Sequence, residues 1–223
     1  MPSDLVPRPP YLGEPLAVEL MNSIWADRSG VHDALSTSGG VEEWLRRAPQ
    51  IPGCAEGELH RWLTTARRRD LDEIRGRLRD LRASLRRLAA AQTEDLREHA
   101  TSPLNDVDQA VIDINAAAAQ APHWSRLVWP DGVEPAREVH TDSKIGVAIT
   151  AGIAEHAIEL FSGDQRRDLR ACMAPGCVLY FIKQHPRREW CSATCGNRAR
   201  AARHYQRHKA SDRRPAATDG RPG

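Results

Sequence analysis

Four of the five cysteines in this sequence lie close together near its C-terminal end, as two pairs. Four residues separate Cys172 from Cys177, thirteen follow, and three separate Cys191 from Cys195. Two close pairs joined by a segment long enough for a hairpin are typical of a structural zinc site, in which four thiolates surround the ion tetrahedrally. The spacing therefore predicts that these four cysteines bind Zn²⁺, the one cofactor that we expect.

A redox-active dithiol is the main alternative for these cysteines. It is disfavoured because neither pair has the C-x-x-C spacing of thiol oxidoreductases. A site in which His185 replaces one thiolate is a lesser variant. A zinc ion held by four cysteines has no open coordination position for water, so this site is not expected to be catalytic.

The residues around the cysteines predict a small module of a hairpin and a helix. Pro175-Gly176 bends the first pair, residues 178–182 are β-prone, and residues 188–190 are expected to return as a second strand after a turn. Ser192 is expected to cap a helix whose first turn carries Cys195. This order resembles a treble clef, and its few apolar residues imply that metal binding supplies much of the folding free energy.

Basic side chains accumulate in the same part of the chain. Residues 1–163 contain 18 basic and 25 acidic side chains, whereas residues 164–223 contain 14 and 5. Such a division is expected when one module meets a polyanion, although a solvated basic tail without a partner gives the same count. The predicted nucleic-acid-binding residues are Lys183, Arg187, Arg188, Arg198, Arg200, Arg203, Arg207 and Lys209. Aromatic side chains suited to stacking on single strands are few, so duplex DNA is favoured over RNA.

Upstream of the module the sequence predicts a helical bundle. Apolar residues alternate spacings of three and four within 58–100 and again after Ser102-Pro103, and a third helix is expected from a cap at Asp142 to Ser162. The first seam also fits a dimerising coiled coil, but the bundle is preferred because a second seam follows at once. The two seams are Leu71, Ile74, Leu78, Leu81, Leu85 and Leu88, and then Leu104, Val107, Val111, Ile114 and Ala118.

Shorter elements complete the helical part. Short helices are expected within residues 12–22 and 41–47, turns between Trp25 and Gly40, and a β-hairpin around Pro130-Asp-Gly132. Glu19 and Asn22 lie three residues apart on the first helix and, with Trp25, are candidates for a small-molecule pocket. The alternative for Asn22 is a simple helix cap.

The expected fold is mostly α, with an N-terminal helical bundle, a short β-hairpin and a small C-terminal zinc finger made of a β-hairpin and a basic helix. The expected division is a flexible arm (1–12), a helical domain (13–163), the zinc finger (164–209) and a disordered tail (210–223). The N-terminus lacks the apolar core of a signal peptide, and no segment approaches the ~20 apolar residues of a membrane span, so we expect a cytoplasmic protein.

The residues of the C-terminal module resemble the CGNR zinc-finger proteins. Cys195-Gly-Asn-Arg198 is the tetrapeptide that names that family, and Trp190-Cys-Ser192 and Leu169-Arg-Ala-Cys172 match it as well. Gly13-Glu-Pro-Leu16, followed by Asn22, is similar to the start of the helical domain that precedes this finger in the family. The resemblance implies a bacterial, stress-related transcription regulator with zinc held by Cys172, Cys177, Cys191 and Cys195.

These observations predict a zinc-dependent DNA-binding regulator whose helical part senses a small-molecule effector or forms a homodimer. The alternative is a zinc-stabilised protein-interaction module that does not bind DNA. We do not expect an enzyme, because the sequence shows no phosphate-binding glycine loop, paired carboxylates or Ser/His/Asp grouping in a recognisable context.

Overall fold

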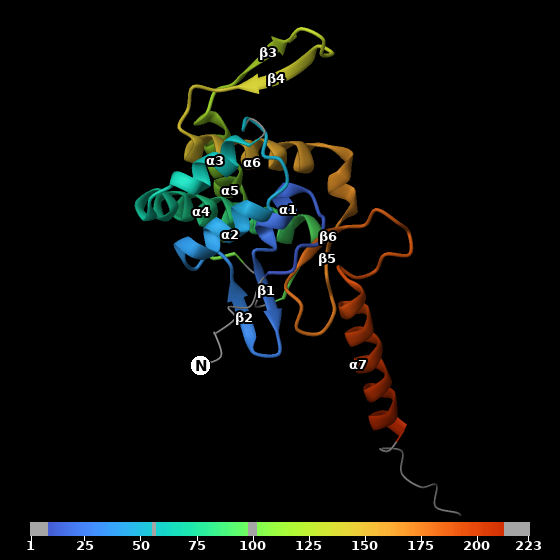
Figure 1. Cartoon of the computed structure of the whole chain (residues 1–223). Coiled ribbons are helices and arrows are strands. Elements are labelled where there is room, and N and C mark those ends of the chain that lie inside the picture. Colours follow the sequence, from blue (N-terminus) through green and yellow to red (C-terminus); the bar gives the residue numbers. More distant parts are fainter. Residues whose placement is uncertain (1–8, 55–56, 98–101, 212–223) are drawn as a thin grey trace, which may run out of the picture.

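Helices dominate the structure, a computed structural model that describes residues 9–54, 57–97 and 102–211 (Figure 1). In chain order the elements are α1 (Leu16–Met21), β1 (Ile24–Asp27), β2 (Gly30–Asp33), α2 (Ser38–Arg47), α3 (Glu58–Thr65), α4 (Arg68–Thr93), α5 (Val107–Ala119), β3 (Trp124–Val128), β4 (Ala136–His140), α6 (Ile145–Ser162), the 3₁₀ helix η2 (Asp164–Asp168), β5 (Leu169–Ala171), β6 (Tyr180–Ile182) and α7 (Ala193–Ser211). The mostly helical fold class is confirmed. Residues 1–8 of the expected arm and 212–223 of the expected tail lie outside the described residues.

Helix α4 lies at the centre of the bundle, in contact with α1, α2, α5 and α6. Its apolar side chains recur every three or four residues, so they form one stripe along the helix. The stripe is buried at Leu71, Ile74, Leu78, Leu81 and Leu85. The seam residues therefore pack within the bundle, as the bundle interpretation predicted, and do not form an exposed coiled-coil face.

Helix α6 forms the second wall of the core, with Ile149, Ile153 and Ala157 fully buried. Its length and composition alone would also suit a membrane span, contrary to the sequence expectation, but half of its residues are buried inside the bundle. The expected cap at Asp142 is wrong, because the helix begins at Ile145 after Lys144 and has no side-chain cap.

Two of the predicted helices differ in detail from the structure. The long run expected over 58–100 is broken after Thr65, and α4 starts anew where the Asp70 carboxylate accepts a hydrogen bond from the Arg67 N–H. In α5, Ala110 and Ile114 are buried, whereas the expected seam residue Val111 is 42% exposed. The helix therefore presents a face rotated from the predicted one.

Three antiparallel hairpins accompany the helices. The hairpin β3–β4 was predicted, and it projects from the bundle (Figure 1). The hairpin β1–β2 was missed because only turn residues were recognised there. In the third hairpin β5, rather than residues 188–190, pairs with β6, so the predicted second strand of the zinc module is wrong.

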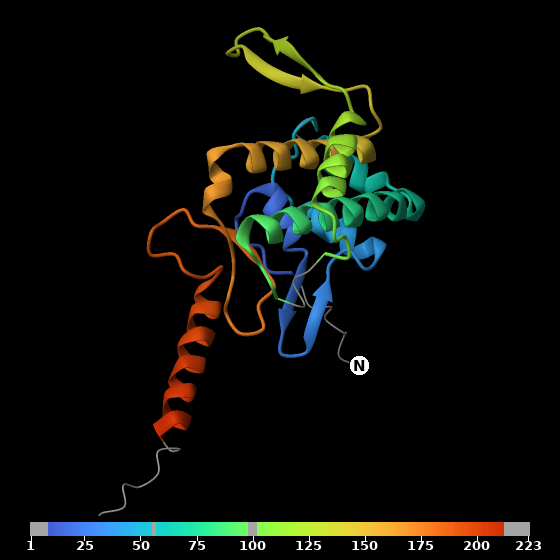
Figure 2. The ribbon, with the colours of Figure 1, turned by 180° about the vertical axis from the view of Figure 1, so that it is seen from behind.

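Helix α7 leaves the rest of the molecule and extends away from it in both views (Figures 1 and 2). Its 19 residues correspond to roughly 28 Å at 1.5 Å per residue. Tyr205, in the second half of this helix, is 67% exposed. Beyond Ala199 this helix therefore presents most of its surface to solvent.

Gly152 marks the closest approach between α6 and the loop before α3. A Cβ at this position would lie 2.0 Å from the Pro52 carbonyl oxygen, whereas a Cβ at Gly76, on the exposed side of α4, meets nothing within 4 Å. We expect Gly152→Ala to lower the free energy of unfolding by about 1–3 kcal/mol through overpacking.

The matched substitution Gly76→Ala should raise the free energy of unfolding by about 1 kcal/mol, because alanine is the better helix former. Urea unfolding of the two variants, followed by circular dichroism, measures both changes. Equal effects of the two substitutions would contradict the close contact at Gly152.

Candidate metal centre and basic surface

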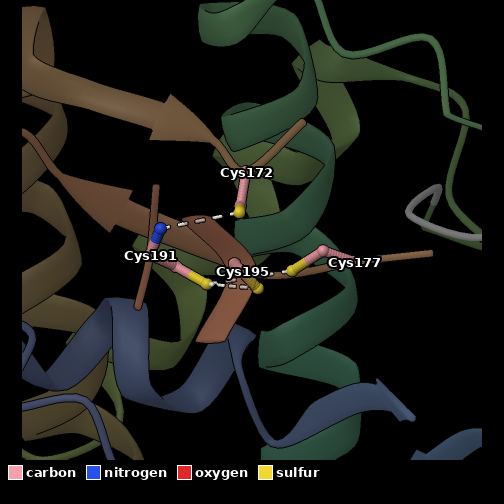
Figure 3. A group of neighbouring side chains, drawn as sticks. All are labelled: Cys172, Cys177, Cys191 and Cys195. Carbon is pink, nitrogen blue, oxygen red and sulfur yellow. Dashed lines mark hydrogen bonds between the residues drawn. The ribbon is translucent and has the colours of Figure 1, made fainter. Parts of the chain in front are cut away.

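The four predicted cysteines converge on one point (Figure 3). Their sulfur atoms all lie within 4.8 Å of one another, and the Sγ of Cys191 is 3.8 Å from that of Cys177 and 3.5 Å from that of Cys195. A tetrahedral zinc ion with Zn–S bonds near 2.3 Å places its sulfurs about 3.8 Å apart. The geometry therefore fits a four-thiolate zinc site.

Turns and a helix start bring these sulfurs together. Cys172 directly follows β5, and Gly176, at φ +72°, allows the tight turn that returns the chain to Cys177. Ser192 accepts a hydrogen bond from the Cys195 N–H at 3.2 Å, as expected of the residue that caps α7. His185 lies apart from the cluster, where its Nδ1 accepts from the Arg187 N–H.

The surroundings of Cys172 and Cys195 favour the thiolate, which is the metal-binding form, whereas hydrogen bonds with the neighbouring cysteines raise the pKa of Cys177 and Cys191. Hydrogen bonds from the thiols of Cys177 and Cys191 lower the pKa of Cys172 to about 7. The guanidinium of Arg198 donates to the Sγ of Cys195 at 3.3 Å. The arginine of the Cys-Gly-Asn-Arg tetrapeptide thus lies against a cluster sulfur.

Arg97 supports the two cysteines of the first pair from outside the cluster. Its Nη1 donates to the carbonyl oxygens of Cys172 and Cys177, at 2.7 Å each. Asp95 binds the same guanidinium at 2.7 and 2.6 Å, and the Tyr180 hydroxyl donates to Asp95 at 2.8 Å. Sequence analysis missed Arg97 and Asp95, because no local spacing indicates that the end of α4 meets the cysteine turn.

Side chains of the helical part cover the edge of β6 that does not pair with β5. The Asn22 amide donates to the Tyr180 carbonyl and accepts from the Tyr180 N–H, both at 2.9 Å. Glu14 accepts from the Ile182 N–H at 2.9 Å and forms an ion pair with Arg188. Asn22 and Glu14 therefore occupy the place of a third strand.

Arg86, on α4, makes a further bridge between the helical part and the zinc module. Its side chain is buried and donates to the carbonyl oxygens of Met21 and Val178, at 2.9 and 3.2 Å. The guanidinium also lies 5.3 Å from the centroid of the Tyr180 ring. Burial lowers the pKa of Arg86 to about 10, which still leaves it charged at neutral pH.

The structure separates the predicted nucleic-acid-binding residues into two groups. Arg200, Arg203 and Arg207 are exposed along one side of α7, with Arg187 and Lys209 also exposed. The other three, Lys183, Arg188 and Arg198, are only half-buried. Arg198 donates a hydrogen bond to the Cys195 sulfur, and Arg188 forms an ion pair with Glu14.

The three candidate pocket residues do lie together. Glu19, Asn22 and Trp25 line one cavity of about 360 Å³ between α1, the start of α2 and residues 9–11. All three side chains are almost fully buried in the structure. Asn22 is not a simple cap, since its amide is bonded to β6.

Family comparisons match almost the whole described chain. Residues 14–164 match the family ABATE, described as "Putative stress-induced transcription regulator", and residues 168–208 match the CGNR zinc finger. No curated protein matches the chain significantly. The first of these matches covers more than half of the sequence.

The metal centre predicts different outcomes for two buried cysteines. Cys195→Ala removes one of four ligands and should abolish stoichiometric zinc binding, whereas Cys54→Ala should leave it intact because Cys54 lies outside the cluster. Zinc content of the purified variants, measured by atomic emission, provides the test. Full zinc occupancy in Cys195→Ala would contradict the four-cysteine site.

Arg97 is expected to act on the metal through the cysteine carbonyls. The substitution Arg97→Gln is made in an Asp95→Asn background, so that no buried carboxylate is left without its partner. In that background it should weaken zinc affinity 10- to 100-fold, as substitution of residues that support metal ligands commonly does. Competition with a zinc-binding dye measures the affinity, and Arg126→Gln on the β3–β4 hairpin is the control. Unchanged affinity in the Arg97 variant would show that the arginine only fills space.

Proposed function

We propose that this chain, which belongs to the ABATE family of putative stress-induced transcription regulators and carries a CGNR zinc finger, binds duplex DNA through α7. Zinc binding and regulation are the coarse functions that family membership indicates. Helix α7 supplies the observation on which the finer proposal rests. It combines a metal-anchored start with a projecting, basic and exposed length.

The shape of α7 suits the major groove of DNA. That groove is about 12 Å wide and admits an α-helix, provided that nothing else covers the helix. Arg200, Arg203 and Arg207 recur at spacings of three and four and so point to one side. We assign to them phosphate contacts first, because guanidinium groups bind phosphate in a bidentate manner.

Zinc gives this helix a fixed starting direction in the proposed mechanism. Isolated helices of this length are marginal in water, and most of the described side chains of α7 beyond Ala199 are exposed. Cys195 lies in its first turn and Cys191 directly precedes its cap, so a bound ion would hold both to the first cysteine pair. The ion therefore orders the helix but takes no part in a reaction.

The alternative to this proposal is that the zinc module binds protein and not DNA. The zinc module does dock on the helical part, but it does so through β6, Arg188 and the cysteine carbonyls. The exposed arginines of α7 are not used in that contact. Intrachain docking and DNA binding therefore use different faces of the same module.

We assign sensing, rather than coiled-coil dimerisation, to residues 13–163. The seam on α4 is buried within the bundle, and the same part of the chain contains the cavity at Glu19. The descriptions of both matching families concern regulation and metal binding, not catalysis. We therefore place the protein among cytoplasmic, non-enzymatic regulators.

Replacing Arg200, Arg203 and Arg207 together by alanine should reduce affinity for duplex DNA at least tenfold with zinc content unchanged. Each lost phosphate contact should also reduce the slope of log K against log salt by about 0.9. Fluorescence anisotropy with a labelled duplex at several salt concentrations measures both. Removing three exposed arginines of α4, Arg68, Arg69 and Arg79, is the charge-matched control.

Equal losses of DNA affinity in the α7 and α4 variants would show that binding depends on the net charge of the protein and not on α7. Absence of salt-dependent DNA binding by the zinc-loaded wild-type protein would overturn the proposal altogether.

A further inference from the structure

The cavity beside α1 is walled by aromatic rings and has a buried carboxylate at its edge. Tyr11, Trp25 and Trp44 line it, and so does Glu19, whose exposed fraction is 3%. Its volume, about 360 Å³, is within the range of small-molecule sites in proteins. The size and the flat walls favour a ligand with a planar apolar body.

The charges around the cavity favour a cation over an anion. Three carboxylates line it, those of Glu19, Asp33 and Glu43, against one guanidinium, that of Arg47. Arg47 donates to the Pro9 carbonyl and lies 5.6 Å from the centroid of the Tyr11 ring, while Asp33 is bound by Arg82 at 2.6 and 2.7 Å. Arg82 therefore compensates the charge of Asp33, while Arg47 is bound by two neutral groups and keeps its positive charge.

Glu19 is the carboxylate best placed to meet a ligand. It accepts hydrogen bonds from the Leu12 and Glu14 N–H groups, at 3.0 and 2.7 Å. Both bonds go to Oε1, and the Gly13 backbone is a further hydrogen-bond partner of the same carboxylate. A buried carboxylate in this state gains from a protonated amine, and aromatic faces add attraction for the same charge.

We propose that this cavity binds a small aromatic amine, with the ammonium group at Glu19 and the ring against Trp25 and Trp44. This inference rests on the proposed regulatory function and names the chemical class of its effector. A carboxylate or phosphate ligand of the same size is disfavoured by the buried carboxylate of Glu19 at the wall.

The residues that line the cavity also hold the zinc module. Glu19 fixes the backbone of residues 12–14, and Glu14 in turn binds the Ile182 N–H and Arg188. Asn22 bonds both backbone groups of Tyr180. Trp25 packs in the same apolar cluster as the four cysteines. An occupant of the cavity therefore stabilises the docked position of β6. By the same linkage, docking of β6 strengthens the binding of that occupant.

Calorimetric titration of the full-length, zinc-loaded protein with tryptamine tests the ligand class. We expect tryptamine to bind and indole-3-acetate, its anionic counterpart, to show no heat of binding. Glu19→Gln keeps an acceptor for the two N–H groups and should weaken tryptamine binding at least tenfold, whereas Glu134→Gln on the loop between β3 and β4 should not.

Two outcomes of this titration would overturn the ligand class. The first is equal binding of the two probes or of the two glutamate variants, and the second is no binding of tryptamine at millimolar concentration. Ala34→Leu, which adds volume at the cavity wall without changing charge, should also weaken binding, and wild-type affinity in that variant would place tryptamine elsewhere.

Hydrogen exchange tests the coupling without any DNA. Saturation with tryptamine should slow exchange of the Tyr180 and Ile182 amides several-fold in the wild type and not in Glu19→Gln. Unchanged exchange despite binding would overturn the coupling. If these amides respond but the protein fails to bind DNA, the effector site stands and the proposed DNA-binding function is the part that fails.

Discussion

Buried charges that find their partners across the contact between the helical part and the zinc module are the constraint on which this structure depends. Arg86, Glu14 and Asp95 are all nearly inaccessible to solvent. A buried ion left without its partner costs about 3–5 kcal/mol. Glu14 finds its ion-pair partner, Arg188, on the zinc module, and the Val178 carbonyl and the Tyr180 hydroxyl of that module hydrogen-bond to Arg86 and Asp95. The two parts are therefore held in one arrangement by electrostatics and hydrogen bonds as much as by apolar packing.

Helix α1 links this contact to the cavity. It has only six residues, too few to be stable alone, and all of them are buried. Its apolar side chains join the core, whereas Glu19 and the cap residue Asn22 face polar partners on loop 12–14 and on β6. So short a helix is held in place only by its neighbours. A displacement at one end of α1 is therefore transmitted to the other end. This short helix therefore joins the cavity at Glu19 to the contact between Asn22 and β6.

Local spacing was sufficient for part of this architecture. The cysteine cluster, the bundle seam on α4 and the shared cavity of Glu19, Asn22 and Trp25 all follow from residue types at short separations, which turns and helix periodicity convert directly into proximity. The pairing of β5 with β6 could not be predicted this way, because it goes with contacts between distant parts of the chain, such as the ion pair of Arg188 with Glu14, that no local spacing indicates. Arg97 escaped notice for the same reason, since its partners lie 75 and 80 residues away.

The distance along the chain between docking partners has a consequence for how the protein is made. Asn22 and Glu14 meet residues 158 and 168 positions later. At about 5–20 residues per second, the ribosome delivers those partners roughly 8–30 s after the first helix. Until then Glu14 lacks its ion-pair partner Arg188, and Asn22 lacks the backbone groups of Tyr180. The segment that supplies these partners also carries the four cysteines. Metal capture by Cys172, Cys177, Cys191 and Cys195 and closure of the contact with the helical part therefore both wait for the same late segment of the chain, so the two events are coupled during synthesis.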